Sequence, residues 1–212
     1  MDFKHLLALL GDETLFESAL LLAGVVDPDY VRLQLTRWKN DGRIYQLRRG
    51  LYAVAPPYQK NKPHPFVVAN NIVRASYVSC QSALAFYGMI PENVHQTTSV
   101  TGKRPGIWET PLGAYQYRHI KPELLRGYRL TEVSAGRNAL VAAPEKALLD
   151  LVYFQPQGDT PAYLQGLRLQ NLDTLDLEKL ESQAARFGSP KISRSVGVIR
   201  SLVQAEREYE TL

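Results

Sequence analysis

Side chains that can donate hydrogen bonds to base edges and phosphates recur at helical spacing between residues 28 and 41. They form two neighbouring stripes, the first made by Tyr30, Gln34 and Arg37 and the second by Arg32, Thr36 and Lys39. No acidic residue interrupts residues 30–40. A helix with this outer face is slim enough for a major groove, so the pattern indicates a DNA-recognition helix.

Two more arginines extend the same chemistry. Arg48 and Arg49 precede Gly50 between two short alternating runs, at 43–47 and 51–54, which predict a β-hairpin with a glycine turn. The tip of this hairpin is expected to meet a phosphate strand or a minor groove. Residues 30–65 hold eight Lys or Arg and only one acid, whereas residues 1–29 hold one lysine and six acids. A basic block of this kind indicates an anionic partner, although a solvated charged face is the alternative.

The elements that position these side chains follow from periodicity and stop signals. An N-terminal domain of residues 1–55 is expected to contain helices at 3–10, 15–23 and 28–41, with Gly24 ending the second. Asp27 and Pro28 suit the start of the third helix, and Val31, Leu35 and Trp38 should face the core. Helix, helix, helix, hairpin is the order of a winged helix-turn-helix. The alternative to DNA binding is that this helix and hairpin dock on the rest of the chain or on another protein.

Four prolines in residues 56–65 predict an extended linker to a second domain at 66–212. That domain is expected to be mixed, with a small sheet and C-terminal helices, so the fold class is α+β. The expected helices are 65–75, 79–87, 144–154, 161–169, 176–187 and 190–209, and the expected strands are 96–101, 114–120, 128–133 and 139–142. Ser79 is expected to cap the helix that it begins. Lys103 and Arg104, in a basic turn at 101–106, are candidates for an additional phosphate contact, and a solvated hairpin loop is the alternative.

Several classes of protein and site are excluded. Hydrophobic residues make up 45% and charged residues 22%, as in a soluble globular protein. The single cysteine, Cys80, allows no disulfide framework or thiolate zinc site and is expected to be a small core residue. The histidines form no i, i+4 pair, and no phosphate-binding glycine motif occurs. We therefore expect no metal, no cofactor and no catalytic residue.

The uncharged stretch 75–91 is too short and polar to span a bilayer, so a cytoplasmic protein without a membrane partner is expected.

Three segments resemble the AbiEi antitoxins of type IV toxin–antitoxin and abortive-infection systems. WKNDGRIYQLRRGLYA at 38–53 is similar to their winged-helix domain. YVSCQSAL at 77–84, followed by YGMIP at 87–91, is similar to a stretch of their second domain, as is PEKALLDL at 144–151. One departure is Tyr87, where many members carry histidine. The resemblance covers about residues 14–155.

The resemblance implies a definite function. Such antitoxins bind inverted repeats of double-stranded DNA in their own promoter and repress it. Their second domain counteracts a nucleotidyltransferase toxin without a stable complex, and no enzymatic activity is implied. Two alternatives stay open. One is a winged-helix regulator unrelated to a toxin, and the other is a second domain that binds RNA through Tyr115, Tyr117 and Tyr128, unless these tyrosines fill the core.

Overall fold

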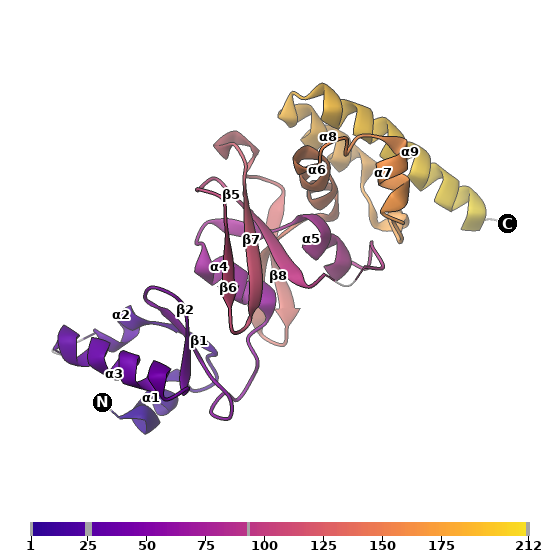
Figure 1. The fold of residues 1–212 in the computed structure, drawn as a ribbon. Coiled ribbons are helices and arrows are strands. Elements are labelled where there is room, and N and C mark those ends of the chain that lie inside the picture. Colours follow the sequence, from indigo (N-terminus) through magenta and orange to yellow (C-terminus); the bar gives the residue numbers. More distant parts are fainter. Residues whose placement is uncertain (1, 24–26, 93, 211–212) are drawn as a thin grey trace.

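The computed structural model describes residues 2–23, 27–92 and 94–210, which form a mixed α+β fold (Figure 1). Gly24, the expected end of the second helix, lies outside the described residues. A small sheet and its helices come first, a larger sheet lies in the middle of the molecule, and helices gather at the far end. No helix within the described ranges combines the length and the apolar composition needed to cross a membrane.

The N-terminal unit contains short helices and a three-stranded sheet in the strand order β1-β3-β2. Its elements are α1 (Phe3–Leu10), β1 (Leu15–Glu17), α2 (Ser18–Leu21), α3 (Pro28–Asn40), β2 (Ile44–Arg48) and β3 (Leu51–Val54). α3 begins as predicted, because the Asp27 carboxylate accepts a hydrogen bond from the Asp29 N–H at 2.9 Å and Pro28 occupies the first turn. The hairpin between β2 and β3 is also confirmed, with Gly50 at φ +80° in its turn.

The prediction of one helix over residues 15–23 is wrong. Leu15–Glu17 forms β1, which pairs with β3 in antiparallel register so that Leu15 lies opposite Ala53 and Glu17 opposite Leu51. Only Ser18–Leu21 is helical. Leu15, Phe16 and Glu17 contain nothing that forbids a helix, and pairing with a strand more than 30 residues later decides their conformation.

The second unit is built on a six-stranded mixed sheet in the order β6-β7-β5-β4-β9-β8. β5 pairs with β7, and β4 with β9, in parallel register, while the other neighbours are antiparallel. The strands are β4 (Ser76–Val78), β5 (Gln96–Thr101), β6 (Gly106–Thr110), β7 (Gly113–His119), β8 (Tyr128–Ser134) and β9 (Arg137–Ala142).

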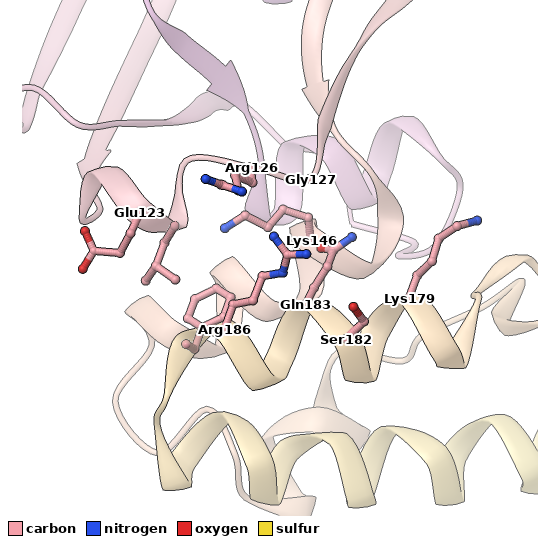
Figure 2. A pocket seen from close by; sticks show the side chains of 10 residues that line it. Glu123, Arg126, Gly127, Lys146, Lys179, Ser182, Gln183 and Arg186 are labelled. Carbon is pink, nitrogen blue, oxygen red and sulfur yellow. The ribbon is translucent and has the colours of Figure 1, made fainter.

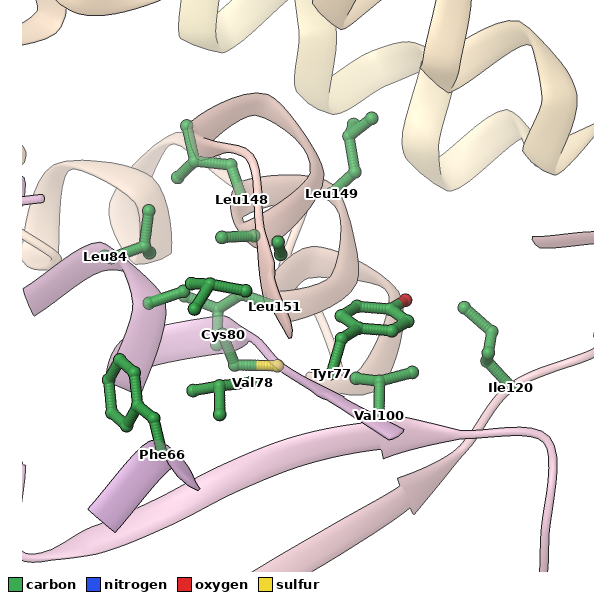
Figure 3. Packing of buried hydrophobic residues seen from close by; sticks show 14 of the residues in the cluster. Phe66, Tyr77, Val78, Cys80, Leu84, Val100, Ile120, Leu148, Leu149 and Leu151 are labelled. Atoms are coloured by element: carbon green, nitrogen blue, oxygen red, sulfur yellow. The ribbon is translucent and has the colours of Figure 1, made fainter. Parts of the chain in front are cut away.

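Helices cover this sheet and form the C-terminal end. They are α4 (Pro65–Ile72), α5 (Cys80–Phe86), α6 (Pro144–Phe154), α7 (Pro161–Gly166), α8 (Leu177–Phe187) and α9 (Pro190–Glu210), with 3-10 turns η1 (Pro122–Leu124) and η2 (Leu172–Thr174). The main core lies where α5 and α6 meet the sheet. Figure 3 shows Leu84 and Leu148 from the two helices in one cluster with Val78 and Val100 from the strands.

Two features of this unit differ from the prediction. β4 and β6 were not expected as strands, and the loop at residues 102–105 is not a hairpin loop. It joins β5 to β6, which are not neighbours, because β7 lies between them in the sheet. The sequence gives no local signal for this, since a parallel pairing such as β5 with β7 is decided by contacts between distant segments.

The proline-rich segment begins with a turn, and the linker between two domains stays a prediction. The N–H groups of Tyr58 and Gln59 both donate to the carbonyl of Ala55. The Tyr58 ring lies edge-on to Phe3, with ring centroids 5.1 Å apart, and Pro63 is buried. The domain boundary at residue 55 stays a prediction, but the segment that follows it packs against the N-terminal unit.

β3 is buried on both faces and belongs to two hydrophobic cores. Tyr52 and Val54 pack in the N-terminal core, whereas Leu51 and Ala53 pack in the core of the second unit together with Leu47 of β2. Side chains alternate across a strand, so every second residue reaches each core. This strand therefore fixes the hairpin against the second sheet.

Leu51→Ala tests this double packing. Leu51 is 1% exposed, so the substitution leaves a cavity between the hairpin and the second core and should cost about 2–5 kcal/mol of unfolding free energy. Leu9→Ala, at a leucine of α1 that is 50% exposed, is the matched control and should cost no more than about 0.5 kcal/mol. Urea unfolding followed by circular dichroism measures both, and equal losses would contradict the packing described here.

Candidate nucleic-acid interface

α3 separates an apolar face from a polar one, as its periodicity predicts. Val31, Leu35 and Trp38 are each 4% exposed and pack in the N-terminal core. The residues expected to contact DNA lie on the two sides that flank this apolar face. Five of them are exposed, namely Tyr30, Arg32, Thr36, Arg37 and Lys39, and Gln34 is half-buried. The core residues thus orient the polar stripes toward solvent.

The cations of α3 differ in whether they already have an acidic partner. Arg32 forms an exposed ion pair with Asp29 at 2.6 Å, and Thr36 Oγ1 donates to the Arg32 carbonyl at 2.9 Å. Within the described part of the chain, no acid pairs with Arg37 or Lys39. Surface ion pairs of the Arg32 type are weak and readily exchanged. Arg37 and Lys39 are therefore the cations of α3 that are most available to an anionic partner.

The two hairpin arginines have different surroundings. Arg49 is exposed at the turn, whereas Arg48 is half-buried. Arg48 donates to Glu17 Oε1 at 3.0 Å and to the Asn71 carbonyl of α4 at 3.2 Å, and Arg74 approaches the other oxygen of Glu17 at 2.8 Å. Arg48 would have to leave these partners to reach a phosphate. The geometry therefore favours Arg49 as the tip contact and gives Arg48 a role in joining the two units.

Lys103 and Arg104 lie on the exposed loop between β5 and β6. The loop backbone is held by the second sheet, because the Lys103 N–H donates to Thr101 Oγ1 at 3.2 Å and the Lys103 carbonyl lies 3.0 Å from His119 Nδ1. No hydrogen bond or ion pair between described residues joins this loop to α3 or to the hairpin. The structure thus does not bring these two cations together with the others, and a phosphate contact there stays a prediction.

Two of the three tyrosines considered for RNA stacking are in the core. Tyr115 and Tyr117 are each 1% exposed, and the Tyr117 hydroxyl donates to the Ala69 carbonyl at 2.7 Å. Burial raises the pKa of Tyr115 to about 12. Tyr128 is stacked on Tyr77 with ring centroids 4.6 Å apart. Base stacking requires an open ring face, so Tyr115 and Tyr117 serve packing, whereas Tyr128 is 39% exposed.

Cys80 is 3% exposed at the start of α5, as expected of a small core residue. Burial raises the pKa of its thiol, so the thiol stays protonated at neutral pH and is a poor nucleophile. In the part of the chain that the structure describes, no three His, Cys, Asp or Glu side chains gather as metal ligands.

A buried polar cluster joins the second and third of the segments that resemble a known family. Asp150 of α6 is fully buried and accepts hydrogen bonds from Tyr77 at 3.0 Å, Ser79 at 2.8 Å and Lys146 at 2.5 Å. Burial raises the pKa of the Asp150 carboxyl, while Lys146 and the two hydroxyls act in the opposite direction. Contrary to expectation, the Ser79 side chain does not cap α5, because its hydroxyl is used here. The i, i+4 spacing of Lys146 and Asp150 within an apolar run is the signal that could have identified this pair.

Comparison with known proteins places the chain by fold alone. No protein-family model matches it, and no curated protein sequence matches it. The crystal structure of the RV2827C protein from Mycobacterium tuberculosis is similar, with a TM-score of 0.59 and 16% sequence identity, over 93% of this chain and 76% of that one. The similarity extends over both units of the α+β fold.

Arg48→Met tests the role given to this arginine. The substitution removes its bonds to Glu17 and Asn71, and because the pair is partly solvent-screened we expect a loss of only about 1 kcal/mol in unfolding free energy. Arg49→Met, one residue away, is the control and should leave stability unchanged within about 0.5 kcal/mol. Thermal unfolding of both variants measures the difference. A stability loss in Arg49→Met alone would reverse the assignment.

Lys146→Met tests the buried pair. It leaves Asp150 buried without a counter-charge, which should cost about 3–5 kcal/mol of unfolding free energy. The double variant Lys146→Met with Asp150→Asn contains no buried charge, so it should be more stable than the single variant. Chemical denaturation measures both. If the double variant is no more stable than the single one, the loss comes from packing and not from the unpaired charge.

Proposed function

We propose that this protein binds operator DNA through α3 and the β2–β3 hairpin and represses transcription. The observation that carries the proposal is that Arg37 and Lys39 of α3 are exposed without an acidic partner in the described residues, next to a hairpin whose tip presents Arg49. The order of helices and hairpin is that of a winged helix-turn-helix. With β1 added as a third strand, that interpretation still accounts for the N-terminal unit.

The distribution of charge supports DNA over a protein partner. The outer face of α3 has cations and uncharged donors between Tyr30 and Asn40, and acids occur only at its start and beyond its end. Donors of this kind suit phosphates and the acceptor-rich edges of guanine and adenine. Leu33, which is 47% exposed on the same helix, could pack against a thymine methyl group.

We further propose that the operator-binding protein is an AbiEi-type antitoxin that counteracts a nucleotidyltransferase toxin without a stable complex and without enzymatic activity of its own. The support is the resemblance of three segments, two of which contribute Ser79 and Asp150 to one hydrogen bond in the core. A regulator unrelated to a toxin is the alternative. A nucleotidyltransferase gene adjacent to this one favours the antitoxin. Growth rescue by the full chain when that toxin is expressed tests the antitoxin proposal directly. Failure to rescue would contradict it and favour the regulator unrelated to a toxin.

Operator binding is tested by footprinting on the DNA upstream of the protein's own gene. We expect protection of an inverted repeat, because two copies of a winged helix related by symmetry read two half-sites. Protection that requires neither a repeat nor a defined sequence would contradict the proposed repressor.

Arg37→Ala and Arg49→Ala should separate base reading from phosphate contact. Arg37 lies on the stripe with Tyr30 and Gln34, where its guanidinium can pair with a guanine edge, so its loss should cost about 1–3 kcal/mol on the operator and little on random DNA. Arg49 lies at a turn that meets the backbone, so its loss should weaken both DNAs alike and reduce the salt slope by about one unit.

Fluorescence anisotropy titrations of both variants against both DNAs, at several salt concentrations, measure these effects. Arg48→Met is the matched control for the hairpin and should leave the salt slope unchanged. If Arg49→Ala removes sequence preference, the hairpin reads a groove. If neither substitution changes binding, α3 and the hairpin are not the DNA-binding surface.

A further inference from the structure

A second group of cations lines a cavity of about 250 Å³ between η1 and α8. Four of its lining residues are basic, Arg126, Lys146, Lys179 and Arg186, and one, Glu123, is acidic. Figure 2 shows the ends of Arg126, Lys146 and Arg186 turned toward the same space, whereas Lys179 extends away from it. Lys179 is paired with Asp176 at 2.7 Å. Arg126 and Arg186 are therefore the cations without an acidic partner among the described residues that converge on the cavity, and Lys146, paired with Asp150, lies beside them.

One of the cations at this cavity is built into the core. The Lys146 side chain is 3% exposed, its Nζ lies 2.5 Å from Asp150 Oδ1, and it stands 4.8 Å from the centroid of the Phe187 ring. Arg126 and Arg186 are exposed, and no described acid forms an ion pair with either. A concave site with an excess of one charge concentrates the opposite charge. The cavity is thus electrostatically suited to an anion.

A buried amide oxygen at the same cavity lacks a hydrogen-bond partner. Gln183 Oε1 is buried without a hydrogen-bond partner, and it faces Gly127, where an added Cβ would lie 2.8 Å from it. Buried polar atoms are normally paired, and an unpaired one indicates a missing partner. The Gln183 side chain also lines the cavity. A hydroxyl group can serve either orientation of this amide, because it both donates and accepts.

We propose that this cavity binds a small phosphorylated molecule that carries hydroxyl groups, such as a sugar phosphate or a nucleotide. The phosphate would lie between Arg126 and Arg186, whose planar guanidinium groups can each bind two phosphate oxygens, with Lys146 behind it. A neighbouring hydroxyl would pair with Gln183, and the Phe187 ring offers an apolar wall. The cavity volume of about 250 Å³ is far larger than the roughly 10–15 Å³ that a single water molecule needs.

This inference is independent of the proposed operator binding. In Figure 1, α8 lies at the opposite end of the molecule from α3, with the six-stranded sheet between them. None of the cavity residues belongs to the proposed DNA surface. Failure of one proposal therefore leaves the other unaffected, and the same variants can be examined for both.

The test is isothermal titration calorimetry of the full chain with inorganic phosphate, ribose 5-phosphate, adenosine monophosphate and ribose. We expect one saturable site for the phosphorylated probes and none for ribose. Arg126→Gln and Arg186→Gln should each weaken binding at least about tenfold, which corresponds to about 1.4 kcal/mol. Lys121→Gln removes the same charge at an exposed residue outside the lining and should change affinity less than about twofold. Gln183→Leu should weaken ribose 5-phosphate more than inorganic phosphate.

A single-stranded oligonucleotide without a terminal phosphate separates a free phosphate from a nucleic-acid backbone. Equal competition by this oligonucleotide would overturn the small-molecule proposal, as would equal binding by the arginine variants or no binding of any phosphorylated probe. Both arginines are exposed, so their variants should keep the fold, which circular dichroism checks. Arg126→Lys and Arg186→Lys keep the charge but lose the two-pronged donor geometry. They should bind more weakly than the parent chain and better than the glutamine variants, and parent-like affinity would reject bidentate binding.

Discussion

The buried ion pair between Lys146 and Asp150 is the contact on which the second unit depends. Asp150 connects α6 to the end of β4 and the start of α5 through Tyr77 and Ser79. Lys146 connects the same pair to α8 through the ring of Phe187. Desolvation offsets most of the attraction within a buried pair, so its main effect is to penalise arrangements that separate the two charges. It thereby fixes which surfaces of the sheet and helices meet.

A different constraint joins the two units. β3 contributes alternate side chains to two cores, so the hairpin cannot move relative to the second sheet without exposing Leu51 or Ala53. Arg48, Glu17 and Arg74 add polar contacts around the same junction. The proposed DNA-binding face is therefore held in one orientation by apolar packing. Recognition of two half-sites at fixed spacing benefits from that rigidity.

Burial divides the basic residues of this chain into two functional groups. Arg37, Lys39 and Arg49 are exposed and available to an external anion, whereas Arg48 and Lys146 are engaged with Glu17 and Asp150 inside the structure. Arg126 and Arg186 belong to the first group but converge on a cavity. Net charge alone does not distinguish these cases, because the difference lies in the acids that the fold brings near each cation.

The sequence by itself determined the features that depend on neighbouring residues. The periodicity of Val31, Leu35 and Trp38 predicted the buried face of α3. β-branched residues located β5 at 96–101, and Pro144 with Glu145 located the start of α6 at 144–154, both with the observed bounds. Capping by Asp27 was likewise a local property. In each case the hydrogen bonds or the burial pattern involve residues within a few positions of one another.

Only the tertiary structure decided the features that depend on distant segments. Residues 15–17 became a strand because β3 was available to pair with them. The Ser79 side chain makes no cap hydrogen bond and donates instead to Asp150, 71 residues later. The partner of Arg48 and the convergence of Arg126, Lys146 and Arg186 arise in the same way. Local propensities differ by less than about 1 kcal/mol for most residues. A single buried hydrogen bond or apolar contact made by the fold is enough to override them.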